Sequence, residues 1–298
     1  MRFRGIPRRI HGRPPWRRSQ RYTRVIVAMP IVRQRLGRLV TLIASGALVV
    51  SALTPSPYVI EQEGPAYDTL GTVSTSEGST GRPVVEITGA ATHPTSGSLY
   101  MLTVNVVGSP AAQPTWVQTL VAWADPDRAV LPMDLVYQPG TSAEEEDART
   151  EREMTASQQD AITAALDRLG YTDPATAPQI SIHLDDVGGP SAGLMFALAI
   201  IDKLGTESLT GGQSIAGTGT IDAQGAVGRI GGIRQKILAA RDRGAQWFLA
   251  PSGNCDDLRG AIPAQMTVLS VDTLDDAVTA LEQIAVTKSA DGLPQCER

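Results

Sequence analysis

The sequence predicts an α/β (α+β) fold with helices packed on a mixed sheet, preceded by one transmembrane helix. Strand-length apolar or alternating runs recur between amphipathic runs of helix length, with Gly, Pro, Asn and Asp at their boundaries. An uncharged, mostly apolar run also follows an Arg-rich arm near the N-terminus. With 298 residues, 42% of them hydrophobic, the chain is long enough to bury a core.

Charge divides the chain into a basic arm and an acidic body. Residues 1–40 contain 12 Arg and no acid, and the first acidic residue is Glu61. The remainder holds 14 basic and 31 acidic side chains, a formal charge of −17. Because binding to phosphates needs clustered Lys and Arg, we expect no nucleic-acid partner for the body.

The Arg-rich arm and the apolar run that follows it predict that the body of the chain lies outside the cytoplasm. We interpret residues 1–38 as a basic cytoplasmic arm and 39–57 as a transmembrane signal anchor, which would place residues 58–298 outside a cell membrane crossed once. One alternative is a cleavable signal peptide, with Val50-Ser51-Ala52 as the cleavage site. The other is a nucleic-acid-binding tail on a cytosolic protein.

We expect residues 58–178 to form an extracytoplasmic N-terminal region. Glu61–Gly81 is rich in Gly, Ser and Thr and indicates a tether or irregular entry. The highly charged stretch Thr141–Glu153 indicates a solvated segment, and Ser157 with Asp160 resembles a capping box at a helix start. The expected elements are strands at Pro83–Ile87 and Ser98–Val107 and helices at Trp116–Trp123 and Ser157–Leu169.

Residues 179–285 predict a second, compact domain, and residues 286–298 a C-terminal tail. The expected strands are Gln179–Leu184, Ile215–Ile221, Trp247–Ala250 and Thr267–Val271. The expected helices are Ser191–Leu204, Ile230–Arg243, a short one near Cys255–Arg259, and Thr273–Ile284.

Few residues are available for histidine, metal or nucleotide chemistry. A Ser-His-Asp triad would need His93 or His183, because His11 lies in the basic arm; His183 sits in an alternating strand and indicates a structural role. The two Cys and two remaining His have no metal-ligand spacing, and no GxxxxGK[ST] phosphate loop occurs. We therefore expect no metal, no cofactor and no ATPase module in these residues.

Lys236 is unusual among the charged residues. The chain has 23 Arg but only three Lys, and Lys236 shares a helix face with Ile233, Ile237 and Ala240. Burial on that face would lower the pKa of the amine and make it available as a neutral base. The alternative is a lysine at the edge of the apolar stripe whose amine reaches solvent.

The second unusual feature is Gly188-Gly189-Pro190-Ser191-Ala192-Gly193 before an apolar helix. Glycine permits a tight turn, and Pro190 fixes φ at the helix entry. Ser191 would then lie in the first turn, where free backbone N–H groups can stabilise an oxyanion. The alternative is that Ser191 only caps the helix.

Together these segments resemble the proteolytic domain of Lon-type serine–lysine peptidases. The resemblance covers about residues 179–285 and rests on Gly189–Gly193, Thr218–Ile221, Val227–Lys236 and Ala239–Arg241. It implies Ser191 as nucleophile, Lys236 as general base and Thr218 as the residue that holds the lysine amine, with Gly189, Pro190 and Ala192 in support. Many Lon enzymes have an acidic residue three positions before the serine, where this chain has Gly188.

The whole chain resembles the membrane-anchored branch of this family without an ATPase. Members usually carry a PDZ module between the helix that ends here near Gly170 and the strand that begins here near Gln179. In this chain only the eight residues Tyr171–Pro178 lie between the two, which is too short for a PDZ module, so we expect none. The resemblance implies a membrane-anchored, extracytoplasmic serine endopeptidase that acts on envelope proteins or peptides and forms a homo-oligomeric ring. The alternative is a catalytically inactive Lon-like module that binds proteins as a scaffold.

The only two cysteines, Cys255 and Cys296, predict a disulfide if the body lies in an oxidising compartment. The bond would hold the C-terminal tail on the peptidase domain. The alternative is a buried Cys255 and a free Cys296.

Overall fold

The computed structural model describes residues 30–73, 81–138, 140–184 and 187–298. The chain divides after Val50 into two compact units, and Ser51–Arg298 form the second. The first unit is represented by helix α1 (Pro30–Ala52), which crosses the division by two residues. Of the basic arm predicted at residues 1–38, residues 1–29 lie outside the described residues.

Helix α1 contains the apolar run for which a membrane span was predicted. Its described side chains from Leu39 to Val50 are exposed. Within the described ranges, no helix has both the length and the apolar character needed to cross a bilayer. The transmembrane prediction for residues 39–57 is therefore not confirmed.

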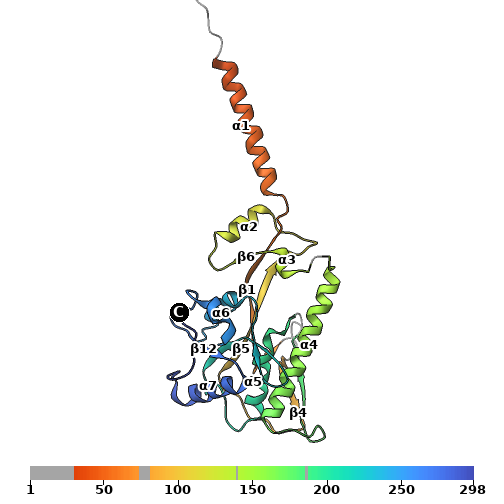
Figure 1. Ribbon diagram of the computed structural model, residues 1–298, viewed down its shortest axis with the longest axis vertical. Helices are drawn as coiled ribbons and strands as arrows, with labels where there is room; N and C mark the ends of the chain where they lie inside the picture. Colours follow the sequence, from red (N-terminus) through yellow and green to blue (C-terminus); the bar gives the residue numbers. More distant parts are fainter. Residues whose placement is uncertain (1–29, 74–80, 139, 185–186) are drawn as a thin grey trace, which may run out of the picture. The chain divides into compact units, whose positions relative to one another are not determined.

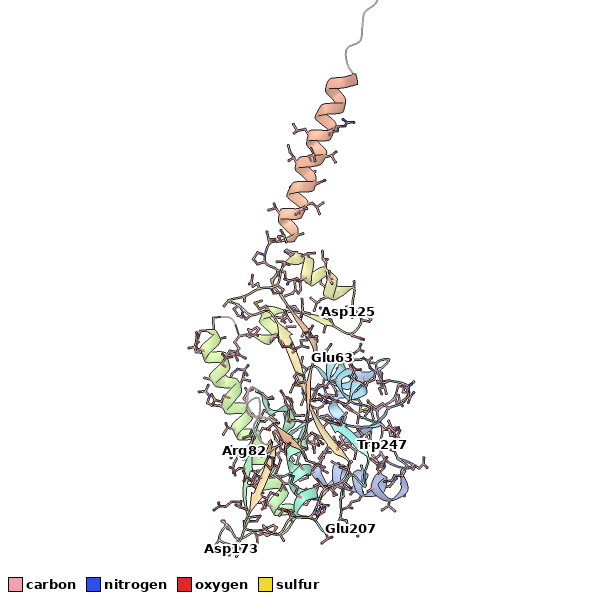
Figure 2. All side chains as sticks on the ribbon, turned by 180° about the vertical axis from the view of Figure 1, so that it is seen from behind. Glu63, Arg82, Asp125, Asp173, Glu207 and Trp247 are labelled. Carbon is pink, nitrogen blue, oxygen red and sulfur yellow. A yellow bond between two sulfur atoms is a disulfide. The ribbon has the colours of Figure 1, made fainter. Side chains whose placement is uncertain are left out.

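A mixed six-stranded sheet forms the centre of the second unit (Figure 1). Its strand order is β12-β11-β8-β5-β1-β6, in which β5, β8, β11 and β12 are parallel and β1 is antiparallel to β5 and β6. Glu63 and Trp247 mark β1 and β11 in Figure 2. The strands are β1 (Tyr58–Asp68), β5 (Ser98–Val107), β6 (Ala129–Pro132), β8 (Ser214–Gly217), β11 (Trp247–Pro251) and β12 (Thr267–Val271).

Helices and short two-stranded sheets complete the unit. The helices are α2 (Trp116–Trp123), α3 (Met133–Val136), α4 (Ala143–Arg168), α5 (Gly193–Leu204), α6 (Ile233–Asp242) and α7 (Leu274–Thr287), with 3-10 helices η1 (Pro190–Ala192) and η2 (Ser252–Leu258). The short pairs are β2 (Thr72–Val73) with β3 (Arg82–Pro83), β4 (Val85–Thr88) with β7 (Gln179–Ile182), and β9 (Thr220–Ile221) with β10 (Val227–Gly228).

Alternating side chains of the central strands fill two cores, one on each face of the sheet. Leu249 packs with residues of α4, α5 and α7, whereas Phe248 packs with α6 and η2. Leu269 and Val268 divide in the same way. This arrangement, in which helices cover both faces of a mixed sheet, confirms the predicted α/β class.

Two predictions in the N-terminal region are wrong. The segment from Glu61, interpreted as a tether, forms most of β1, which pairs with both β5 and β6 in the sheet. The charged stretch Thr141–Glu153 belongs largely to α4, whose capping box consists of Ser142 and Glu145 rather than Ser157 and Asp160. A helix that buries only part of its length needs few apolar residues in its first turns.

The boundary predicted between residues 178 and 179 falls inside the single compact unit Ser51–Arg298. The two regions contribute neighbouring strands to one sheet, because β5 from the first pairs with β8 from the second. They share a core, so the structure offers no division at this position.

Candidate active site

The predicted dyad comes together at the N-terminus of α5. Nζ of Lys236 donates a hydrogen bond to Oγ of Ser191 at 2.6 Å. Lys236 is buried at 3% exposure, while Ser191 is partly exposed. The pair therefore combines a hydroxyl that a substrate can reach with an amine shielded from water.

Burial changes the acid–base properties of the lysine. Loss of hydration disfavours the charged ammonium and lowers the pKa of Lys236 to about 8, and the charge of Glu61 opposes this shift. Conversely, burial raises the pKa of the Glu61 carboxyl, and the lysine charge opposes that change. Glu61 lies on β1, so a strand missed by sequence reasoning supplies the charge that acts on the lysine.

The loop before Ser191 is held by the backbone and by helix α4. Gly189 has φ of 89°, a conformation that favours glycine, and Pro190 begins η1. The N–H of Gly189 donates to the carbonyl of Thr150 at 3.2 Å, and the buried Ser157 hydroxyl donates to the carbonyl of Pro190 at 2.9 Å. Ser157 thus positions the loop, whereas the sequence predicted that it would cap a helix.

Thr218 connects the serine and the lysine. The strand predicted over residues 215–221 is interrupted between β8 and β9, which places Thr218 and Gly219 beside Ser191. The Gly219 N–H donates to the Ser191 carbonyl at 2.9 Å, and Thr218 Oγ1 donates to the same carbonyl at 3.0 Å. Lys236 Nζ donates to Thr218 Oγ1 at 3.1 Å, so this threonine holds both residues of the dyad.

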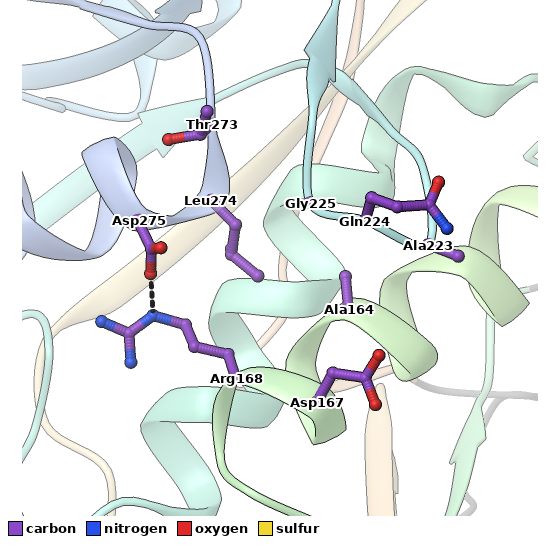
Figure 3. A pocket seen from close by; sticks show the side chains of 9 residues that line it. All are labelled: Ala164, Asp167, Arg168, Ala223, Gln224, Gly225, Thr273, Leu274 and Asp275. Carbon is purple, nitrogen blue, oxygen red and sulfur yellow. Dashed lines mark ion pairs between the residues drawn. The ribbon is translucent and has the colours of Figure 1, made fainter. Parts of the chain in front are cut away.

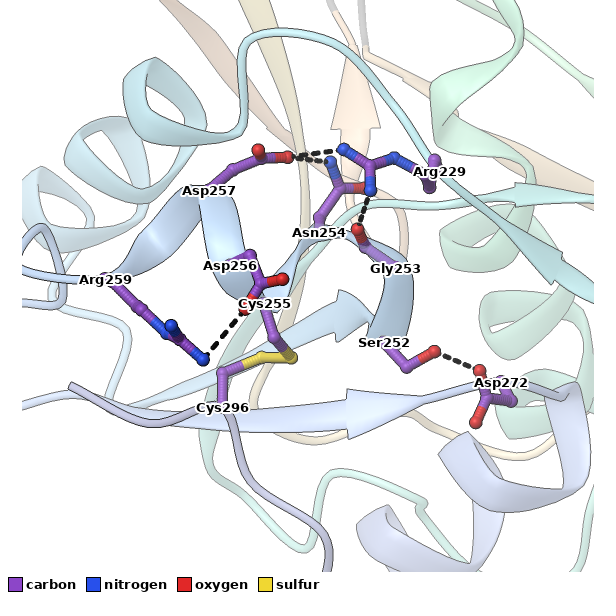
Figure 4. Close-up of a disulfide and its surroundings, with 10 residues drawn as sticks. All are labelled: Arg229, Ser252, Gly253, Asn254, Cys255, Asp256, Asp257, Arg259, Asp272 and Cys296. Atoms are coloured by element: carbon purple, nitrogen blue, oxygen red, sulfur yellow. Dashed lines mark hydrogen bonds and ion pairs between the residues drawn. A yellow bond between two sulfur atoms is a disulfide. The ribbon is translucent and has the colours of Figure 1, made fainter.

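The loop before α6, the helix that carries Lys236, is held in place by neighbouring residues. Gly232 precedes α6 with φ of 64°, and a side chain there would clash with Val104 of β5. The buried Asn254 holds this loop, because its amide both accepts from the Ile230 N–H and donates to the Ile230 carbonyl. Figure 4 shows Asn254 next to Cys255, whose disulfide to Cys296 is formed. The predicted disulfide is thus present and adjoins a residue that positions the lysine loop.

The two histidines that the structure describes, His93 and His183, do not join this site. His183 Nε2 lies 3.0 Å from Glu86 Oε2, which agrees with its predicted structural role. The backbone N–H of His93 donates to the carbonyl of Lys203 at the end of α5. Within the ranges that the structure describes, no group of His, Cys, Asp and Glu could hold a metal ion.

Gly188 stands where the family resemblance would place an acidic residue, and in the structure it lies against Thr150 of α4. A Cβ built on Gly188 would overlap Cγ2 of Thr150 on α4. An acidic side chain at this position would therefore require the Thr150 side chain, α4 or the loop to move. The supporting residues Gly189, Pro190 and Ala192 lie between this contact and α5.

A separate cavity of about 260 Å³ lies between the C-terminal part of α4, the Ala223–Gly225 turn and the start of α7 (Figure 3). Arg168 and Asp275 form an ion pair of 2.8 Å on its lining. Neither Ser191 nor Lys236 lines it, and the arrangement there joins α4 to α7 rather than to the dyad.

Residues 118–284, more than half of the chain, match the model of the Lon protease (S16) C-terminal proteolytic domain. The chain belongs to this family. It therefore carries a serine-type peptidase domain of the Lon type, and the observed mixed α/β fold agrees with that assignment. The match begins at α2, well before the boundary predicted from the resemblance alone.

Curated Lon proteases share part of this sequence. The chain is 37% identical over 94 residues to the Lon protease of Campylobacter concisus, covering 30% of this chain and 11% of that protein. The Chloroflexus aurantiacus Lon protease is 39% identical over 94 residues, with 30% and 11% covered. The Roseiflexus castenholzii Lon protease is 30% identical over 174 residues, which cover 54% of this chain and 21% of that protein. The chain thus spans only about a tenth to a fifth of these relatives.

Proposed function

We propose that this chain is an endopeptidase in which Ser191 is the nucleophile and Lys236 the general base. The observation that carries the proposal is the 2.6 Å contact between a partly exposed serine hydroxyl and a buried amine. Lys236 has its pKa lowered to about 8, so about a tenth of the amine is neutral at pH 7 and about half at pH 8.

In the proposed reaction, neutral Lys236 takes the hydroxyl proton as Ser191 Oγ attacks the carbonyl carbon of the scissile peptide bond. The N–H of Ser191, in the first turn of η1, can hold the oxyanion, whereas the N–H groups of Gly193 and Leu194 already donate to the carbonyls of Pro190 and Gly219. The ammonium of Lys236 then gives its proton to the leaving amine, which leaves an acyl-enzyme. Water attacks the acyl group, Lys236 takes the proton of the water, and the proton returns to Ser191 as the product acid departs.

Labelling with a fluorophosphonate probe tests the nucleophile. The full chain should be labelled on Ser191, as identified by peptide mass mapping, and Ser191→Ala should not be labelled. Ser181→Ala is a matched control, because Ser181 is an exposed serine on β7, and it should label like the wild type. Absence of labelling and of peptide hydrolysis in the wild type would instead favour the inactive scaffold module.

A second part of the proposal is that the peptidase works outside the cytoplasm, tethered to the cell membrane by residues 39–57 with residues 1–38 inside. The Cys255–Cys296 disulfide supports an oxidising compartment. The tether itself is proposed from the Arg-rich flank and the apolar run of the sequence. Protease added to intact spheroplasts should degrade the body and spare a short basic fragment. A body that is protected until the cells are lysed would contradict the proposal.

The substrates we propose are envelope proteins and peptides, and the proposed assembly is a homo-oligomeric ring like that expected from the family. Support comes from the family match and from the proposed location. The mass of the full chain in detergent, measured by light scattering, should then be a multiple of 31.5 kDa after correction for detergent. A monomer at concentrations that give full activity would exclude the ring.

A further inference from the structure

A cavity of about 690 Å³ lies next to the loop that leads to the proposed nucleophile. Val187 and Gly188 line it on the loop side, and Gly188 is three residues before Ser191. Helix α4 forms the facing wall with residues spaced by three or four positions, which places them on one face of the helix. A substrate extending along the loop from Ser191 would therefore pass the mouth of this cavity.

The lining combines apolar and acidic groups. Met154 is buried, and Ile182 is partly buried, so the cavity has apolar surface for an aliphatic stem. Asp147 and Glu151 are exposed residues of the same lining, one turn apart on α4. No Lys or Arg is among the lining residues that the structure describes, and His183 is engaged with Glu86.

The two carboxylates are also free of the ion pairs that bind their neighbours. Arg149 on α4 pairs with Glu146 and Glu153, and Arg152, which follows Glu151 in the sequence, does not line the cavity. In the described part of the chain, neither Asp147 nor Glu151 forms a salt bridge. Their charge is therefore left to act on whatever enters the cavity.

Gly188 lets the loop approach α4 closely at the edge of the cavity. Its missing Cβ would point at Thr150, which also lines the cavity. A larger residue would overlap Thr150, and this close approach would be lost. Among the lining residues that the structure describes, the acidic groups come from the facing helix.

We propose that this cavity receives an Arg or Lys side chain of the substrate, close to the scissile bond, and that Asp147 and Glu151 select it. The aliphatic stem would lie on Met154 and Ile182 while the cationic head meets the carboxylates. This inference rests on the proposed function, since it assigns a specificity to the Ser191 site.

Paired fluorogenic peptides test the selection with the full chain. One series carries Arg at each position flanking the scissile bond, and the matched series carries citrulline, which has nearly the same shape without the charge. At one position we expect kcat/KM to be about tenfold higher for Arg, which is the size of two partly exposed ion pairs. The preference should fall as salt is raised, because exposed charges are screened.

Substitutions assign the preference to the cavity. Asp147→Asn with Glu151→Gln should reduce the Arg-to-citrulline ratio to about one, mainly by lowering kcat/KM for the Arg peptide. Glu144→Gln is the matched control, because Glu144 is an exposed acid on α4 that does not line the cavity, and it should keep the wild-type ratio. A ratio that is one in the wild type, or that survives the double substitution, would overturn the proposal.

Binding separates this proposal from the proposed function. Ser191→Ala should bind a fluorescent Arg peptide more tightly than its citrulline counterpart in an anisotropy titration, and the double substitution should remove the difference. If this difference is seen but the wild type neither hydrolyses peptides nor reacts with fluorophosphonate, the cavity assignment holds and the peptidase function fails. Equal binding of the two peptides contradicts the cavity assignment, whatever the activity.

Discussion

Thr218 Oγ1 lies 3.1 Å from Nζ of Lys236 and donates at 3.0 Å to the backbone carbonyl of Ser191. The hydroxyl thus accepts from the lysine and donates to the residue that bears the nucleophile. Thr218 is 1% exposed, so water does not substitute for either contact. A neutral hydroxyl can orient the amine without adding a charge that would raise its pKa.

Substitution of Thr218 should separate orientation from packing. Thr218→Val keeps the shape but leaves the lysine and the Ser191 carbonyl without this partner, and kcat should fall about 10- to 100-fold. Thr218→Ser keeps the hydroxyl and should retain most of the activity. Steady-state kinetics with one peptide, and thermal unfolding to confirm folding, provide the measurement. Wild-type kcat in Thr218→Val would exclude an orienting role.

Lys236→Arg should abolish hydrolysis although it keeps a positive charge. A guanidinium does not deprotonate in this pH range, so it cannot take the proton of Ser191. Lys236→Met should also be inactive, yet at least as stable as the wild type, because it removes a buried amine that has lost its hydration. Activity assays and thermal unfolding of both variants check this. Hydrolysis by Lys236→Arg at near wild-type rate would show that another group is the base.

The dyad was predictable because each member lies in a short local pattern. Pro190 before an apolar helix marks the turn of Ser191, and the i, i+3, i+4 spacing of Ile233, Lys236 and Ile237 places the lysine on the buried face. The contact between the two residues depends on tertiary structure. Its prediction came from the family resemblance rather than from either pattern.

The contributions of β1 and α4 were not predictable in the same way. Glu61, Gln62 and Glu63 interrupt the apolar alternation of β1, because the strand is only partly buried there. On α4 the capping box of Ser142 and Glu145 was present in the sequence, but the charged residues after it obscured the helix. The contact of Thr150 with the Gly188 loop joins segments far apart in sequence, and no local pattern reports it.

The rate of hydrolysis should follow the deprotonation of Lys236. Because the neutral amine is the proposed base and its pKa is lowered to about 8, kcat/KM should rise with pH and level off above about pH 8. Glu61→Gln removes a negative charge that favours the ammonium, so the lysine pKa should fall and the rising limb should move to lower pH. The pH profile of kcat/KM for both proteins is the measurement.

Glu63→Gln is the control for this shift, because Glu63 is an exposed acid on the same strand. It should leave the pH profile unchanged. Stability offers an independent check of the sign. The folded pKa lies below the ordinary value of 10.5, so the unfolded state binds more protons between about pH 8 and 10.5, and the free energy of unfolding should rise with pH in that window. A rising limb in Glu61→Gln that moves to higher pH would refute the electrostatic assignment.

Reduction of the disulfide should destabilise the fold more than it impairs the chemistry. Cys255 and Cys296 are 41 residues apart, and opening a loop of this size lowers the free energy of unfolding by about 3–4 kcal/mol on the chain-entropy account. For a unit of this size that corresponds to a Tm lower by about 10 °C. Dithiothreitol should produce this change in the wild type, and the variant with both cysteines replaced by Ser should show the lower Tm without it.

Two contacts limit the effect on the active site. The chain before Cys296 is also held along β12, where the N–H of Cys296 donates to the carbonyl of Val268 at 3.0 Å. On the other side of the bond, Asn254 keeps its own hydrogen bonds to Ile230, two residues before the glycine that begins the lysine helix. Well below the lowered Tm, kcat/KM of the reduced enzyme should therefore stay within about twofold of the oxidised value, since neither contact needs the sulfur–sulfur bond. Two thiols titrating with maleimide in the denatured, unreduced protein would contradict the disulfide itself. A large loss of kcat/KM at unchanged Tm would show that the bond acts on the loop before the helix of Lys236 rather than on stability.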